Sequence, residues 1–125
     1  MEGVTRKNFV SRLLQAVPEF HEVYHDEIEA NRDLPYTIVD DLLAYVLALF
    51  SRNLIEEGGP FRRALQFLEQ ANQTSILEIT DIISCSFLEN VQHAGKDYFR
   101  FRDFLGPSLR RDLALIDGEN PEFGE

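Results

Sequence analysis

The sequence has little of what disulfide, redox or phosphate chemistry requires. Its 125 residues include no tryptophan and one cysteine, Cys85. One cysteine excludes an internal disulfide and any C-x-x-C pair. The Gly-rich phosphate loop and the G-x-S-x-G nucleophile motif are also absent from the sequence. We predict that Cys85 is a buried, unreactive thiol on the apolar side of a helix, and we expect no bound cofactor.

Long apolar runs are lacking as well. The longest, residues 42–50, is far shorter than the roughly 20 residues that a membrane-spanning helix needs. Arg6 and Lys7 lie near the N-terminus, but the apolar stretch after them is short and interrupted by polar residues, unlike a signal peptide. These features predict a cytoplasmic protein that does not associate with membranes.

Positive charge is scarce. Lysine and arginine number 12 against 22 acidic residues, and the net charge is −10. Residues 19–57 hold ten acidic and two basic residues, a net charge of −8, whereas residues 96–111 hold five basic and two acidic residues. A strongly negative field repels nucleic acids and attracts basic proteins. We therefore expect a basic protein partner and no nucleic-acid ligand, although an acidic surface can also serve solubility alone.

The sequence does contain a series of helical patterns, with almost no strand signal. Apolar residues recur at helical spacing, and Gly58-Gly59-Pro60 and Gly106-Pro107 mark clear breaks. The expected helices cover about residues 5–17, 19–31, 37–57, 60–71, 76–93 and 108–116, with a short aromatic helix or turn at 96–104. Thr37 and Ser75 are expected to cap two of them. We predict a single all-α domain over residues 1–117, an irregular antiparallel bundle of five to six helices, followed by a flexible acidic tail at 118–125.

One short motif points to metal chemistry. Residues 21–25 read His21-Glu22-Val23-Tyr24-His25, the H-E-x-x-H pattern of zinc hydrolases. On a helix, His21 and His25 would share one face and could bind one Zn²⁺, with Glu22 as the general base. The sequence identifies no third ligand, however, and two histidines that face solvent among acidic residues are the simpler explanation. We therefore predict no metal site and keep a zinc hydrolase as the alternative.

Acidic residues on a shared helix face are the best candidates for partner binding. Glu22, Asp26 and Glu29 follow helical spacing, and like charges at that spacing cost stability unless a partner compensates for them. Glu56 and Glu57 add a second acidic pair. We predict that these five carboxylates contact a basic partner by electrostatic complementarity.

Basic residues near the C-terminus lie among aromatic residues, a composition that also occurs in RNA-binding surfaces. Because the overall field opposes nucleic acid, we expect these residues to pair with the acidic second helix or with the tail. They are Lys96, Arg100, Arg102, Arg110 and Arg111.

Several stretches of the chain resemble a family of small, uncharacterised all-helical bacterial proteins. They are residues 34–36 (LPY) leading into 41–45 (DLLAY), residues 86–91 (SFLENV) and residues 104–109 (FLGPSL). The family that they resemble includes immunity proteins, which neutralise a cognate toxin. The resemblance implies an all-helical fold, but it carries over no functional residue.

Charge and resemblance together predict a non-enzymatic immunity or antitoxin-like protein that binds a cationic toxin, in the first place a nuclease. The alternatives are the zinc hydrolase and a structural or adaptor module with a large apolar surface patch. The sequence predicts no oligomeric state.

Overall fold

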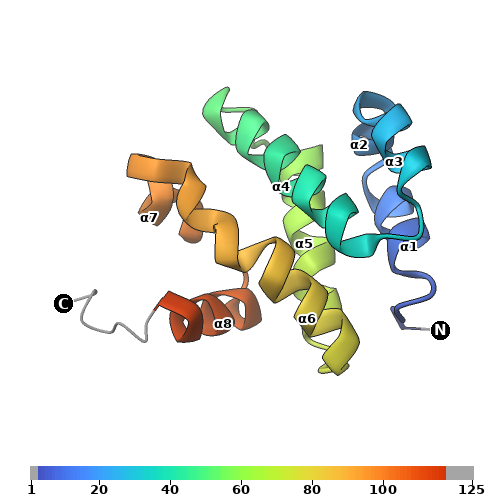
Figure 1. The fold of residues 1–125 in the computed structure, drawn as a ribbon. Helices are drawn as coiled ribbons and strands as arrows, with labels where there is room; N and C mark the ends of the chain where they lie inside the picture. Colours follow the sequence, from blue (N-terminus) through green and yellow to red (C-terminus); the bar gives the residue numbers. More distant parts are fainter. Residues whose placement is uncertain (1–2, 118–125) are drawn as a thin grey trace.

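Helices make up the described chain apart from its turns. The computed structural model describes residues 3–117, and Figure 1 shows their arrangement. The elements are α1 (Phe9–Ala16), α2 (Pro18–Val23), α3 (His25–Ala30), α4 (Pro35–Ser51), α5 (Pro60–Asn72), α6 (Leu77–Ser86), the 3₁₀ segment η1 (Leu88–Asp97), α7 (Tyr98–Arg102) and α8 (Pro107–Asp117). No strand occurs between residues 3 and 117, so the prediction of a single all-α domain is confirmed for them.

Four helices begin at a proline. Proline lacks the N–H that a first helical turn would leave unpaired, and its fixed φ suits that turn. Two predicted caps are therefore wrong. Thr37 lies inside α4, because Pro35 opens that helix two residues earlier. Ser75 has a φ of 61°, and Ile76 takes the cap position of α6 instead. The prolines that open helices are Pro18, Pro35, Pro60 and Pro107.

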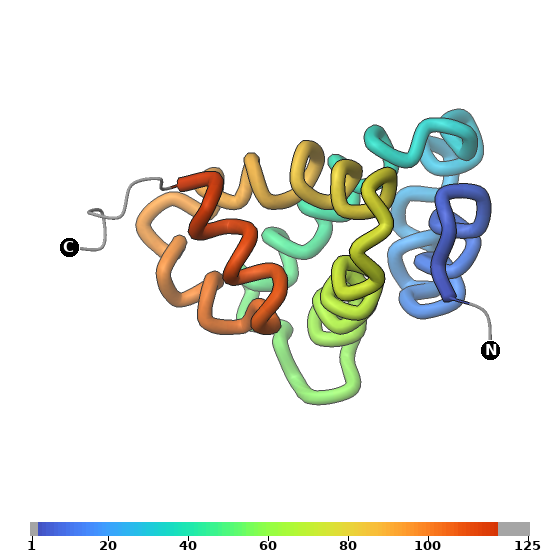
Figure 2. Tube along the Cα trace, turned by 90° about the horizontal axis from the view of Figure 1, so that it is seen from below, coloured from blue at the N-terminus to red at the C-terminus, as the bar shows by residue number. Residues whose placement is uncertain are grey.

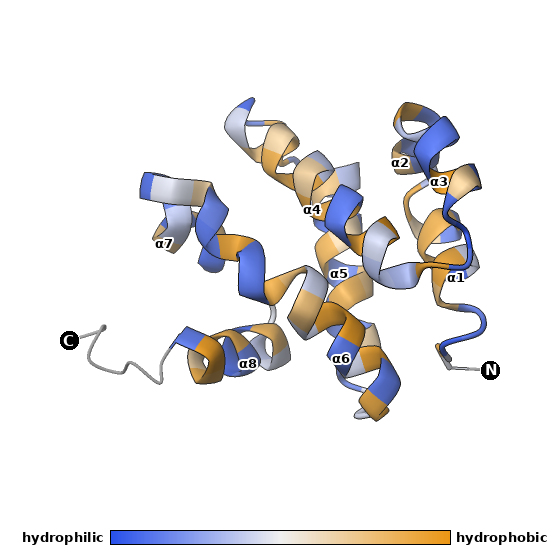
Figure 3. Cartoon of the chain, in the orientation of Figure 1, coloured by the Kyte–Doolittle hydropathy of each residue, from blue (hydrophilic) through white to orange (hydrophobic). Residues whose placement is uncertain are grey.

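Helix α4 lies at the centre of the core. It packs against α1, α5, α6 and η1, and its residues Ile38, Leu42 and Val46 are completely buried. Figure 3 shows hydrophobic residues concentrated along α4 and α5, whereas α3 and the segment that follows it are largely hydrophilic. Because buried apolar residues lie on several sides of α4, this helix packs between the others.

The remaining elements lie on either side of this centre. Figures 1 and 2 show α1, α2 and α3 at one end of the molecule, and α7 and α8 at the other. At the second end, the rings of Phe50, Phe61 and Phe101 pack with centroids 5.3–6.0 Å apart. The acidic helices and the basic C-terminal elements are thus separated by the length of the core.

A glutamate of α5 caps the first turn of α8. Glu69 Oε2 accepts the N–H of Ser108 and Oε1 accepts the N–H of Leu109, both at 3.0 Å. Burial acts to raise the pKa of Glu69, but these two donations, together with hydrogen bonds from the side chains of Gln73 and Ser108, hold the pKa below its ordinary value. A Cβ at Gly106 would lie 2.4 Å from the Glu69 carboxyl carbon, so glycine leaves room for the cap.

The finer predictions of helix number and arrangement are not confirmed. The helix predicted for residues 19–31 is divided into α2 and α3, and the one predicted for 76–93 ends at Ser86 and continues as η1. Within η1, Gly95 has a φ of 66°, a conformation that the absence of a side chain permits. The tail predicted at 118–125 lies outside the described residues. Between residues 3 and 117, no helix is both long and apolar enough to cross a bilayer.

Candidate functional site

Helices α2 and α3 present one polar face to solvent because their opposite face is anchored in the core. Phe20 and Ile28 are completely buried. The Phe20 ring lies 5.4 Å from that of Tyr24 and 5.5 Å from that of Tyr45 on α4. This aromatic contact fixes which side of the two short helices faces outward.

Tyr24 joins α2 to α3, and its backbone is not helical, with a φ of −111° and a ψ of 30°. The N–H of Tyr24 donates to the carbonyl of Phe20 at 3.0 Å, and the N–H of Ile28 donates to the carbonyl of Tyr24 at 2.9 Å, so both helices remain hydrogen-bonded to this residue. The imidazoles of His21 and His25 stack with centroids 5.2 Å apart and an interplanar angle of 14°.

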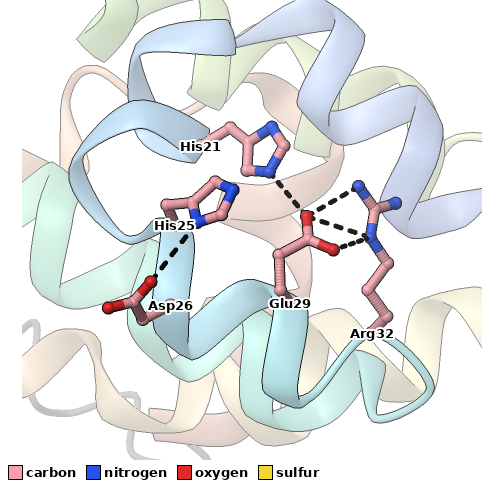
Figure 4. Close-up of polar contacts among 5 residues, drawn as sticks. All are labelled: His21, His25, Asp26, Glu29 and Arg32. Carbon is pink, nitrogen blue, oxygen red and sulfur yellow. Dashed lines mark hydrogen bonds and ion pairs between the residues drawn. The ribbon is translucent and has the colours of Figure 1, made fainter.

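Glu29 lies one turn beyond His25 on the same face. The N–H of His21 Nε2 donates to Glu29 Oε2 at 2.8 Å, and Arg32 Nη2 donates to the same oxygen at 3.0 Å (Figure 4). The hydrogen bond from Arg32, followed by that from His21, lowers the pKa of Glu29 to about 2. The carboxylate is therefore ionised at neutral pH.

These three side chains form a group with the composition of a metal site, which we call the His–Glu cluster (His21, His25 and Glu29). One potential ligand atom from each lies within 4.8 Å of the others. The cluster is open to solvent, because 62% of the His25 side chain and 40% of the Glu29 side chain are exposed. Imidazole nitrogen and carboxylate oxygen are both ordinary Zn²⁺ ligands.

Glu29, and not Glu22, is the carboxylate that lies beside the two histidines, although the H-E-x-x-H motif assigns the chemical role to Glu22. The Glu22 side chain is exposed and forms no hydrogen bond or ion pair with any residue from 3 to 117. The signal that could have identified Glu29 is spacing, since positions 21, 25 and 29 are successive turns of one helix face. The Glu29 carboxylate already accepts hydrogen bonds from His21 and Arg32, so it is less available to a basic partner than Glu22 is.

A second acidic side chain anchors α2 to α5. Arg63 Nη1 donates to the carbonyl of Ala16 at 2.8 Å and to Glu19 Oε1 at 3.0 Å. This hydrogen bond from Arg63 is the main reason that the pKa of Glu19 is lowered. Arg63 Nε also donates to the carbonyl of Gly58 at 2.9 Å, which brings the connection between α4 and α5 beside the start of α2.

The five predicted partner-binding carboxylates do not form one compact group. Glu22, Asp26 and Glu29 follow α2 and α3, whereas Glu56 and Glu57 lie in the connection between α4 and α5. Glu57 is paired with Arg62 Nη1 at 3.0 Å, and Glu56 forms no ion pair with any described residue. Glu22, Asp26 and Glu56 are therefore the members of the set that lack an arginine or lysine partner within the described part of the chain.

Within residues 3–117, none of the basic C-terminal residues pairs with the acidic helices α2 and α3, so that part of the prediction is wrong. The acidic tail at 118–125, the other predicted partner, lies outside the described residues. Arg100 lies 4.3 Å from the centroid of the Phe50 ring, and Arg102 lies 4.8 Å from that of Phe99. Arg111 pairs with its neighbour Asp112. Arg100 and Arg102 belong to α7 and Arg111 belongs to α8, and Figure 1 shows both helices at the opposite end of the molecule from α2 and α3.

The prediction that Cys85 is buried is also wrong, because its position on α6 is exposed. Its sulfur lies 3.7 Å from Asp81 Oδ1. Partial burial of the thiol, together with the charges of Asp81 and Glu89, raises its pKa. The thiolate is thus disfavoured, which argues against a nucleophile at this position.

Comparison with known proteins identifies one family. A search of curated proteins and a search of solved structures find no significant match. The family described as "Domain of unknown function (DUF7674)" matches residues 10–118, and this description contains no link to immunity proteins. Because the match covers most of the 125 residues, the chain belongs to the DUF7674 family.

Proposed function

We propose that this chain is a binding protein whose acidic end recognises a basic protein, in the manner of an immunity protein that covers a cationic toxin. The observation that supports it is a set of exposed carboxylates that have no arginine or lysine partner between residues 3 and 117, namely Glu22, Asp26 and Glu56, within a segment of net charge −8. Charged groups that stay hydrated in the free protein can pair with a cationic surface without first breaking an internal ion pair.

The arrangement of the core supports the same proposal. The aromatic contact of Phe20 with Tyr45 and the Glu19–Arg63 ion pair hold α2 in place from the inner side. Glu22 therefore sits on a helix that is already held in place, and a partner does not need to order it on binding. Lys96 and Arg110 at the opposite end form no ion pair with any residue from 3 to 117. The two ends therefore carry opposite charge, and this asymmetry would orient the acidic end toward a basic partner.

A zinc hydrolase is the second candidate, and the His–Glu cluster is the observation that favours it. The cluster lies on an open helix face with His25 62% exposed, whereas hydrolytic sites usually lie in a cavity that limits access of water. This geometry favours binding over hydrolysis. An adaptor module is weaker on similar grounds, because large exposed apolar side chains occur on separate elements, such as Val23 on α2, Leu77 on α6 and Phe99 on α7.

The experiment compares two triple variants of equal net charge. In the first, Glu22, Asp26 and Glu56 are replaced by lysine; in the matched control, Glu78, Glu89 and Asp103, which are exposed elsewhere, are replaced by lysine. The probe is a basic nuclease toxin encoded beside the gene, and the readouts are association rate at low and high salt and protection of cells that express the toxin. We expect the first variant to associate at least about tenfold more slowly and to lose protection.

The control variant should bind nearly as well as the unmodified chain, since its carboxylates lie away from the proposed surface. An equal loss in both variants would show that only overall charge matters and would refute the assigned surface. Absence of binding to every basic product of the flanking genes would refute the proposed function itself.

A further inference from the structure

The His–Glu cluster has a donor set that suits one class of metal ion. It offers two imidazoles and one carboxylate from successive turns of α2 and α3. Nitrogen ligands are typical of Zn²⁺ and similar transition metals, whereas Mg²⁺ and Ca²⁺ prefer oxygen ligands alone. Three protein ligands would leave a fourth tetrahedral position open to water or to a side chain of another molecule.

The distances are close to those that a bound ion requires. Tetrahedral Zn²⁺ with ligands at about 2.0–2.1 Å places the ligand atoms about 3.3 Å from one another. In the structure His21 Nε2 and Glu29 Oε2 are 2.8 Å apart, and all three ligand atoms lie within 4.8 Å. An ion would therefore open the first distance slightly and close the others by rotation of exposed side chains, with no change in the backbone.

The surroundings of the cluster provide an orienting group for one ligand. His25 Nδ1 lies 3.4 Å from Asp26 Oδ1, as Figure 4 shows. A histidine that donates one ring N–H to a carboxylate keeps its other nitrogen free for a metal, which is the usual outer arrangement of zinc sites. Asp26 thus favours the His25 tautomer whose Nε2 can coordinate.

Arg32 acts in the opposite direction. Its guanidinium donates to both oxygens of Glu29, at 3.2 Å from Nε to Oε1 and 3.0 Å from Nη2 to Oε2. A metal ion on Glu29 would have to share or displace this cation, since two positive groups would compete for one carboxylate. Arg32 therefore lowers the affinity of the cluster without preventing coordination.

We propose that His21, His25 and Glu29 form a surface site for Zn²⁺, with Asp26 as the positioning residue for His25 and Arg32 as an internal competitor for Glu29. On binding, the metal replaces the proton that links His21 Nε2 to Glu29, and the His21 imidazole takes the tautomer that carries its proton on Nδ1. The site requires neither Glu22 nor hydrolysis. It also does not rest on the proposed partner, because its ligands all belong to α2 and α3.

The test is a calorimetric titration of Zn²⁺ into the full chain, prepared without a histidine tag. A Cys85→Ser background removes the exposed thiol as a competing ligand. We expect one equivalent of Zn²⁺ to bind, and His25→Ala and Glu29→Gln each to weaken binding by at least about tenfold, the lower end of what even an outer partner contributes to a metal site. Glu22→Gln and His93→Ala, which alter exposed groups outside the cluster, should bind as the background does.

Arg32→Ala supplies a result that misfolding cannot mimic. Removing the competitor should tighten Zn²⁺ binding by about two- to fivefold, the change that corresponds to an exposed ion pair. Unchanged affinity in this variant would refute the role of Arg32. Absence of stoichiometric binding, or equal binding by His25→Ala and Glu29→Gln proteins with unchanged circular dichroism, would overturn the site. Partner binding that survives such a result would leave the proposed function intact, so the two proposals fail separately.

Discussion

The junction of α5 with α8 and the outer face of α2 and α3 each place a glutamate among nitrogen donors, with different consequences. Glu69 at the junction accepts two backbone N–H groups of α8, from Ser108 and Leu109. Glu29 on the outer face accepts hydrogen bonds from the side chains of His21 and Arg32. The first contact joins two helices that are distant in sequence, whereas the second joins residues within twelve positions of one another, on α2, on α3 and just after α3.

The difference shows that pairing alone does not mark a functional carboxylate. The partners of Glu69 are the otherwise unpaired N–H groups of a helix start, so its role is to complete secondary structure. The partners of Glu29 are the partly exposed side chains of His21 and Arg32, which can rotate away. In the proposed site, the proton on His21 Nε2 gives way to Zn²⁺. Substitutions should therefore affect stability at the junction and ligand binding at the outer face.

The largest effect on stability is expected for Glu69→Ala. The substitution leaves two N–H groups at the start of α8 without their acceptor, and we expect the free energy of unfolding to fall by about 1–2 kcal/mol. Urea denaturation measures the change, with Gln66→Ala at an exposed position of the same helix as the control. A loss no greater than that of the control would mean that Glu69 does not cap α8.

A smaller effect is expected for Gly106→Ala, because the added Cβ would meet the Glu69 carboxyl group at 2.4–2.6 Å and displace it. We expect a loss of about 1 kcal/mol through the weakened cap. In a Glu69→Ala background the same change should cost little, since the displaced group is gone. Additive losses in this double-mutant cycle would contradict the proposed contact.

The smallest effect is expected at the outer face, where it concerns protonation. The pKa of Glu29 is about 2, chiefly because of the hydrogen bond from Arg32, so its contribution to stability is complete above pH 4.5 and is lost as the pH falls toward 2. In Arg32→Ala the pKa of Glu29 should rise toward its ordinary value of 4.5, and the thermal midpoint at neutral pH should fall only slightly, because an exposed ion pair contributes little to stability. NMR titration of the Glu29 carboxyl carbon tests this, with Arg52→Ala as the control; a midpoint near 4.5 in the unmodified chain would contradict it.

Helix positions were largely predictable because they depend on neighbouring residues. The segment expected at 60–71 is α5 (Pro60–Asn72), and the one expected at 108–116 is α8 (Pro107–Asp117). Helix α4 begins at Pro35, two residues before the expected start, because the proline opens the helix and Thr37 does not cap it. The change from α6 to 3₁₀ geometry after Ser86 was not visible in an apolar pattern that continues through both segments.

The site was predictable only in part. The shared face of His21 and His25 follows from helical spacing, and the structure shows their rings stacked. The identity of the third member did not follow, because Glu22, Asp26 and Glu29 are chemically equivalent until a side-chain direction and a neighbour such as Arg32 distinguish them. The exposure of Cys85 was missed for a related reason, since apolar residues on both sides of α6 left its buried face ambiguous.

Local sequence predicts the helical class, the approximate limits of most helices and the concentration of negative charge between residues 19 and 57, because each of these is a property of consecutive residues. It does not predict which carboxylates are committed to the fold, because that depends on contacts between helices. Glu19 meets Arg63 across 44 positions, and Glu69 meets Ser108 across 39. Such contacts depend on how helices pack against one another, and packing is set by the whole core rather than by any local pattern.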